Sequence, residues 1–243
     1  MVGSCISFCG RIPATACART EKVYNRGMNT TLNETRYQYG LRLALAAVCF
    51  LFFCFIAWQV QSGRTEDFDT MVDYAVYDLR NPVTKAILIP ITYLGDWFSI
   101  VPLYALLLVI PATRHPYAFK AIPTGTIGFI LYRILKPAFA RPRPDVSLHL
   151  INQGGWAFPS GHSMNGVICY GVLIFLIWRN VESHKTRIIL TVLLTALIVT
   201  IMFIRIFVGV HYVTDVLGGG SLGLAFLLCA SVVLDKRFYE GKE

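Results

Sequence analysis

The stretch FPSGHSMNGVICYGVLIFLIW, residues 158–178, decides the fold, because it joins a short polar start to an apolar run with no Asp, Glu, Lys or Arg. Its length is close to the roughly 20 residues that cross a bilayer as a helix. Pro159 pre-sets φ for a first helical turn, and Ser160 and Gly161 leave backbone N–H groups uncovered for an anion. His162 stands beside this turn to move a proton. Pro-Ser-Gly is also ordinary turn chemistry, so the rest of the chain must decide.

Composition indicates a membrane protein. Of the 243 residues, 55% are hydrophobic and 15% are charged, whereas soluble domains carry about 25% charged residues. The net charge of +8 needs no nucleic-acid partner, because Lys and Arg accumulate in the cytoplasmic loops of membrane proteins.

The hydropathy pattern predicts an all-α, six-span transmembrane bundle in residues 36–243, preceded by a disordered cytoplasmic tail in residues 1–35. The six predicted spans are residues 43–60, 86–112, 121–135, 158–178, 188–208 and 213–234. Gly95 and Asp96 divide the second span, and Gly218-Gly219-Gly220 in the sixth favours close helix packing.

Residues 61–81, between spans one and two, are polar but carry apolar residues at intervals of three and four. That spacing predicts an amphipathic helix lying in the membrane interface, with a core-packed helix as the alternative. The apolar stripe comprises Phe68, Met71, Val72, Ala75, Val76 and Leu79.

Six spans put both termini on one face of the membrane. Most of the 22 Lys and Arg residues then fall on the face of the termini. We therefore predict a multi-pass plasma-membrane protein with cytoplasmic termini.

Three polar clusters interrupt the apolar pattern, and the predicted topology places all three on the non-cytoplasmic face. The clusters are Lys136 with Arg143, the stretch 159–162, and Arg205 with His211 and Asp215. His211 and Asp215 are four residues apart, so they share a helix face, and a carboxylate on one imidazole nitrogen leaves the other free to attack. Lys136, Arg143 and Arg205 supply cationic donors for a tetrahedral oxyanion, and the Ser160 and Gly161 N–H groups complete the cradle.

Each group also has a plainer interpretation. Lys and Arg residues at these positions are equally typical of residues that set the topology or snorkel to the membrane surface. His211 could instead cap a helix or form a hydrogen bond inside the bundle. Asp96 either borders the site or sits at the membrane surface, and the count back from residue 112 favours the surface. Independent accidents would not place every group on one face, so the pattern favours phosphoryl chemistry with a histidine nucleophile and no metal.

The motifs Lys136-x6-Arg143-Pro144, Pro159-Ser160-Gly161-His162 and Arg205-x5-His211-x3-Asp215 resemble the three-part signature of the type 2 phosphatidic acid phosphatase (PAP2) superfamily. The resemblance implies that His211 is the nucleophile, that Asp215 orients it, and that His162 protonates the leaving group. Phosphate-binding roles would fall to the remaining signature residues, Lys136, Arg143, Ser160, Gly161 and Arg205. One departure is visible: Ile204 precedes Arg205, where the family usually has serine.

The chain is most similar to bacterial six-span members that act on phosphatidylglycerophosphate, phosphatidic acid or undecaprenyl diphosphate. The resemblance implies hydrolysis of such a lipid at the outer face through a phosphohistidine, without cofactor, metal or obligatory protein partner. A phosphotransferase that moves the phosphoryl group to a lipid or sugar acceptor is the nearest alternative. A non-catalytic transporter of anionic lipids is the alternative from another class.

Overall fold

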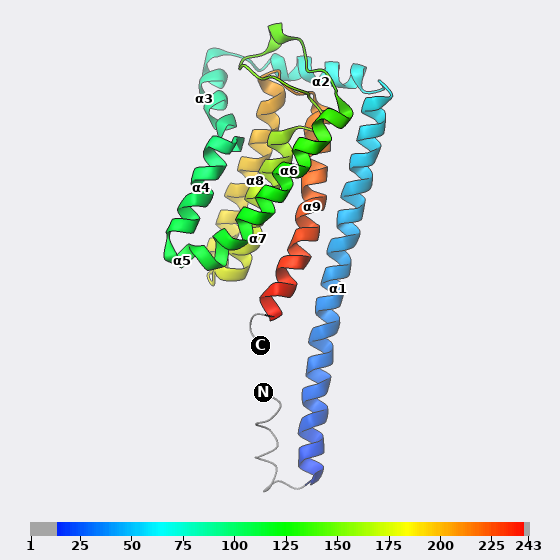
Figure 1. Ribbon diagram of the computed structural model, residues 1–243, viewed down its shortest axis with the longest axis vertical. Helices are drawn as coiled ribbons and strands as arrows, with labels where there is room; N and C mark the ends of the chain where they lie inside the picture. Colours follow the sequence, from blue (N-terminus) through cyan, green and yellow to red (C-terminus); the bar gives the residue numbers. More distant parts are fainter. Residues whose placement is uncertain (1–13, 241–243) are drawn as a thin grey trace. The chain divides into compact units, whose positions relative to one another are not determined.

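The prediction of an all-α protein is confirmed. The computed structural model describes the backbone of residues 14–240 and the side chains of residues 36–235, and within these ranges every regular element is helical (Figure 1). Residues 1–44 and 45–243 form separate compact units, and the site lies wholly in the second.

The helices follow one another with short connections, apart from the long loop between α6 and α7. The main helices are α1 (Ala14–Gln61), α2 (Glu66–Tyr77), α3 (Pro82–Thr92), α4 (Trp97–Val109), α5 (Pro111–Thr113), α6 (Phe119–Phe139), α7 (Gly161–Asn180), α8 (His184–Phe207) and α9 (Val213–Glu240). Three short helical turns lie between them, η2 (Tyr93–Gly95), η3 (Arg114–Ala118) and η4 (Val146–Leu148).

Among the residues that the structure describes, four helical segments are long and apolar enough to cross a membrane: Arg36–Gln61, Gly161–Asn180, His184–Phe207 and Val213–Asp235. The pair Pro82–Gly95 and Trp97–Val109 bends by 56° and makes a fifth if it crosses as one span. This bend falls at the Gly95-Asp96 division expected from the sequence. The 21-residue α6 is long enough to cross but carries three basic residues, so the count of six spans stays a prediction.

The amino-terminal tail is only partly described. The backbone of residues 14–35 forms the first part of the 48-residue helix α1, and residues 1–13 lie outside the described residues. The disordered tail in residues 1–35 stays a prediction.

Helix α7 is the centre of the second unit, packed against α6, α8 and α9. Most of its apolar side chains are buried, among them Met164, Ile168, Val172 and Leu176. The helix that begins with the polar stretch 158–163 is therefore also the helix on which the bundle assembles.

Helix α2 runs across the ends of α8 and α9 (Figure 1). The predicted stripe is divided: Phe68, Met71 and Leu79 are exposed, whereas Val76 is buried. The buried face of α2 carries two acids, Asp69 and Asp73. The exposed apolar side chains leave the interfacial position as a proposal, and the buried acids give α2 a second role.

The glycine run in α9 serves helix packing, as the sequence indicated. A Cβ on Gly219 would lie 2.4 Å from the Ser160 carbonyl oxygen, and one on Gly218 would lie 2.5 Å from the Phe158 ring. Gly219 therefore lets the start of α7 approach the α9 backbone directly.

Replacing Gly219 with alanine is expected to lower the free energy of unfolding by about 1–3 kcal/mol, because the backbone at Ser160 must move. Thermal unfolding in detergent measures the change. Gly166→Ala is the matched control: a Cβ there meets nothing within 4 Å, and alanine in a helix is favoured over glycine by about 1 kcal/mol. Equal destabilisation by both substitutions would contradict the packing role.

Candidate active site

The loop between α6 and α7 brings the three predicted clusters to one end of the bundle. Ala140, with φ 45°, ends α6 in a left-handed turn. The loop is then tied to itself by the Ala157 N–H, which donates to the Arg141 carbonyl over 2.8 Å, and to the end of α8 by the Leu150 N–H, which donates to Val208 over 2.9 Å. The chain between Arg141 and Ala157 thus lies against the turn that carries His211.

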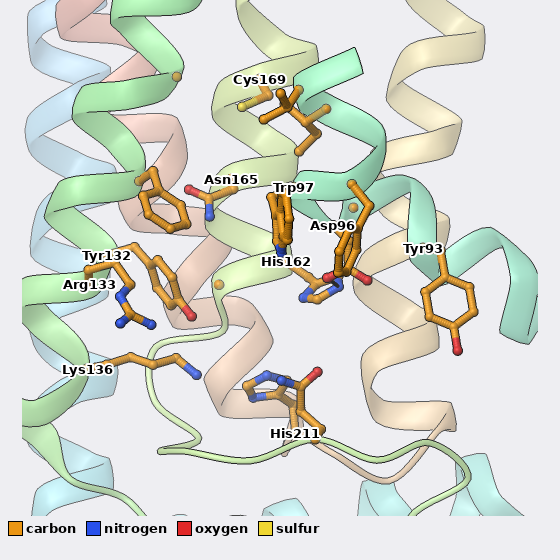
Figure 2. Close-up of a pocket in the computed structure, with 18 of the residues that line it drawn as sticks. Tyr93, Asp96, Trp97, Tyr132, Arg133, Lys136, His162, Asn165, Cys169 and His211 are labelled. Carbon is orange, nitrogen blue, oxygen red and sulfur yellow. Dashed lines mark ion pairs between the residues drawn. The ribbon is translucent and has the colours of Figure 1, made fainter. Parts of the chain in front are cut away.

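A cavity of about 990 Å³ opens between this loop, the η2 bend, α6 and α7. It is lined by five of the residues that the sequence analysis selected: Lys136, Arg143, Gly161, His162 and His211. Figure 2 shows Lys136, His162 and His211 projecting into a common space from three different segments. The remainder of the lining is largely apolar and aromatic, including Ile100, Val101, Ile122 and Phe129.

His211 is held from both ring nitrogens. Its Nδ1 lies 3.4 Å from Asp215 Oδ2, and its Nε2 lies 3.2 Å from Arg143 Nη1. Burial, followed by the positive charge of Arg143, lowers the pKa of His211 well below its usual 6.5. The imidazole is therefore neutral at pH 7, and with its Nδ1 hydrogen directed at Asp215 it presents the Nε2 lone pair to the cations.

Arg143 and Lys136 are oriented by backbone carbonyls of the α6–α7 loop and of the turn between α8 and α9. Arg143 donates to Gly155 over 2.9 Å, to Gly154 over 3.0 Å and to Val210 over 2.5 Å. Lys136 Nζ donates to the carbonyl of Trp156. Both cations are thereby fixed beside His211.

Arg205, at the end of α8, contacts two residues that line the cavity, His162 and Gln153. Its side chain is buried, and it donates to Thr92 Oγ1 over 3.0 Å and to Gln153 Oε1 over 2.9 Å. Arg205 Nη1 also lies 3.4 Å from His162 Nε2. Ile204, the departure from the family pattern, is fully buried in an apolar cluster, so it adds no polar group to the site.

The expectation for Ser160 needs a correction. Its backbone N–H does not face the cavity but donates to the Asp215 carbonyl over 3.0 Å, because Gly219 lets α9 pack directly on this segment. The Ser160 hydroxyl is buried and accepts from Ser163 Oγ over 3.0 Å. Gly161, at the first position of α7, does line the cavity, so the anion-binding turn is reduced to the N–H groups that follow Ser160.

Asp96 is part of the candidate site. Its Oδ1 lies 3.0 Å from His162 Nε2, and both residues line the cavity. The bend is held in place because Tyr170 donates its hydroxyl to the Leu94 carbonyl over 2.5 Å. Counting residues from the end of the span predicted a position near the membrane surface, which stays a prediction, and gave no information about the helix that Asp96 faces.

A buried network behind Asp215 was missed by the sequence analysis. Arg141 lies 2.7 Å from Asp215 Oδ1 and 2.7 Å from Asp69 Oδ2. Asp69 also accepts from the Thr214 N–H over 3.0 Å and from its hydroxyl over 2.8 Å. The sequence does show Arg141 two residues before Arg143, and it shows Asp69 on the predicted interfacial helix. No sequence pattern indicates that these two side chains form an ion pair.

Comparison with known proteins gives consistent matches. The sequence model of the PAP2 superfamily matches residues 118–239, which contain all three motifs. The chain is 32% identical over 184 residues to phosphatidylglycerophosphatase B of Bacillus subtilis, an alignment that covers 72% of this chain and 87% of that protein.

Two solved structures have similar folds. The crystal structure of a transmembrane PAP2-type phosphatidylglycerolphosphate phosphatase from Bacillus subtilis matches with a TM-score of 0.72 and 26% identity, over 79% of this chain and 96% of that one. The crystal structure of Aquifex aeolicus LpxE matches with a TM-score of 0.54 and 21% identity, over 68% of this chain and 94% of that one, which shows a shared fold.

Proposed function

Because this chain belongs to the PAP2 superfamily, we propose that it hydrolyses the phosphate from a membrane lipid phosphate or diphosphate through a phosphohistidine on His211. Phosphatidylglycerophosphate, phosphatidic acid and undecaprenyl diphosphate are the candidate substrates. The name of the relative from Bacillus subtilis supports the first of these.

The observation that carries the proposal is the position of His211 between Asp215 and Arg143, 3.4 Å from the carboxylate and 3.2 Å from the guanidinium. A neutral imidazole oriented by a carboxylate is a nucleophile, and a guanidinium beside its free nitrogen attracts an anionic phosphoryl group to the point of attack. Binding without catalysis would not require this orientation of the ring.

The proposed reaction has two displacements at phosphorus. In the first, His211 Nε2 forms a bond to phosphorus, the bond from phosphorus to the lipid oxygen breaks, and His162 gives a proton to that oxygen. In the second, His162 takes a proton from water, the water oxygen attacks phosphorus, and the bond to His211 breaks to release inorganic phosphate. Lys136, Arg143, Arg205 and the Gly161 N–H stabilise the charge on the phosphoryl oxygens in both steps.

The cavity supports a lipid substrate. Its cationic end can hold a phosphate, and its apolar lining between α4 and α6 can hold the first part of an acyl or prenyl chain. The head group therefore reacts at the end of the bundle while the tail lies between helices.

We place the site on the extracytoplasmic face of the plasma membrane. Spans one to six would be α1, the bent pair α3 and α4, then α6, α7, α8 and α9, with both termini cytoplasmic and α2 in the outer interface. The excess of Lys and Arg on the side of the termini supports this orientation. The three basic residues of α6 suit a crossing because two of them, Arg133 and Lys136, line the cavity.

Phosphate release from purified protein tests the proposal. In a nonionic detergent with EDTA present, the protein is expected to release inorganic phosphate from at least one of the three lipids, because every proposed step uses a side chain of this protein. Failure to release phosphate from any lipid phosphate would contradict the proposed function, and dependence on added metal would contradict its mechanism.

Removing the carboxylate beside His162 tests its role as proton donor. Asp96→Asn is expected to lower kcat by about tenfold or more, a part of the 10²–10⁴-fold that acid and base catalysis contributes, because Asp96 Oδ1 orients the His162 ring. Steady-state phosphate release measures the effect, and thermal unfolding of the same variant checks the fold. An unchanged kcat would remove Asp96 from the mechanism.

A further inference from the structure

Arg133 is a cation in the cavity that does not belong to the three motifs. It lies on α6, three residues before Lys136, and its exposed side chain lines the cavity. Figure 2 shows the guanidinium of Arg133 next to Tyr132, on the same wall of the cavity as Lys136. Residues three apart on a helix are neighbours on one face.

Arg133 differs from the motif cations in having no protein partner. Lys136, Arg143 and Arg205 each donate to a carbonyl or side chain oxygen of the protein. Within residues 36–235, whose side chains the structure describes, no hydrogen bond or ion pair engages Arg133. The five N–H groups of this guanidinium can therefore donate hydrogen bonds to an anionic lipid in the cavity.

Arg133 lies deeper in the bundle than the phosphate site. Helices α6 and α7 are antiparallel, since Gly161 faces Tyr132 whereas Gly125 faces Cys169. Moving back from Lys136 to Arg133 on α6, and forward from His162 to Asn165 on α7, therefore leads in the same direction, away from the loop. Asn165 also lines the cavity, and its side-chain amide carries two N–H donors.

This position corresponds to the part of a lipid head group that follows the reacting phosphate. In the proposed reaction the phosphate binds among His211, Arg143 and Lys136 and the tail lies along the apolar lining, which would place Arg133 and Asn165 between them. A neutral glycerol ester at this point would leave the Arg133 guanidinium without a negative partner. A second phosphate within the lipid head group would supply a negative charge, and its oxygens would accept hydrogen bonds from Arg133 and from the Asn165 amide.

We propose that Arg133, assisted by Asn165, binds a second phosphate of the same lipid molecule and selects substrates that carry two phosphates over phosphatidic acid, which carries one. The inference rests on the proposed function. The second phosphate is either separated from the first by glycerol, as in phosphatidylglycerophosphate, or joined to it directly, as in a polyprenyl diphosphate.

Substrate selectivity of Arg133→Gln tests this assignment. The full chain in nonionic detergent is assayed on phosphatidylglycerophosphate, undecaprenyl diphosphate and phosphatidic acid at equal mole fraction. For at least one of the two-phosphate lipids, the ratio of its kcat/KM to that of phosphatidic acid is expected to fall at least about tenfold, the size of one charged hydrogen bond, mainly through KM. Arg133→Lys is expected to retain part of the selectivity.

Arg187→Gln is the matched control, because it removes a basic residue near the start of α8, at the opposite end of that helix from Arg205. Its selectivity should equal that of the unchanged protein. A fall for phosphatidylglycerophosphate alone assigns the glycerol-separated phosphate, and a fall for the diphosphate alone assigns the directly joined one. An unchanged ratio for both lipids in Arg133→Gln overturns the inference while leaving the hydrolase proposal intact, whereas an inactive unchanged protein defeats the hydrolase proposal itself.

Discussion

Replacing His211 by alanine is expected to reduce kcat for phosphate release by at least about 10⁴-fold, as loss of a nucleophile does in other covalent enzymes. The substitution removes the only protein atom that is proposed to bond to phosphorus. Lys136, Arg143 and Arg205 remain, so the variant should still bind lipid phosphates. Phosphate release and lipid binding, measured on the same preparation, separate the two effects.

His184→Gln is the control for this substitution. His184 begins α8 at the opposite end from Arg205 and packs edge-on against Trp178, so its loss should leave kcat unchanged. Phosphate release by His211→Ala at a rate near that of the unchanged protein would exclude His211 as the nucleophile.

Replacing Arg141 by methionine is expected to lower the free energy of unfolding by about 3–5 kcal/mol, the cost of removing one partner from a buried ion pair. Arg141 lies between two carboxylates, 2.7 Å from Asp69 and 2.7 Å from Asp215, and both acids are fully buried. Without the guanidinium, two buried negative charges face each other. Thermal unfolding in detergent, monitored by tryptophan fluorescence, measures the loss.

The double variant Arg141→Met with Asp69→Asn tests whether the loss comes from the uncompensated charge. Removing one of the two carboxylates should recover part of the stability, so the double variant should be less destabilised than the sum of the single variants by about 0.5–3 kcal/mol. Strict additivity would mean that Arg141 and Asp69 act independently, contrary to the geometry.

The broad arrangement of the site followed from the sequence because membrane topology is a strong constraint. Once the apolar runs are assigned, Lys136 and Pro159 must lie on the face where span five turns into span six. The structure brings Lys136 and His162, which follows Pro159 by three residues, together with His211 around one cavity. The predicted contact of His211 with Asp215 is present, but His211 lies in the turn two residues before α9 rather than on the helix.

Contacts between helices did not follow from the sequence, because no local pattern specifies which helix a side chain faces. Asp69 lies on a helix whose apolar stripe suggested a membrane surface, yet its carboxylate is buried against Thr214. Asp96 faces His162 only because the bend before α4 packs on α7. The Ser160 N–H was assigned to phosphate, but the close approach of α9 at Gly219 directs it to Asp215.

The span count shows the same limit. The sequence predicted six crossings, whereas in the part of the chain that the structure describes four helices are long and apolar enough to cross, or five with the bent pair. Helix α6 is not among them, and Arg133 and Lys136 both lower the hydropathy of its apolar run. Both residues line the cavity, so the residues that weaken the membrane signal are those that the site requires.

The most direct test of the account is to trap the covalent intermediate. The purified protein is mixed with lipid carrying a labelled terminal phosphate, quenched in alkali within a single turnover, and digested for mass spectrometry. The account predicts a labelled phosphate on His211 that disappears as inorganic phosphate forms. Turnover with no labelled protein, or with the label on a residue other than His211, would contradict it.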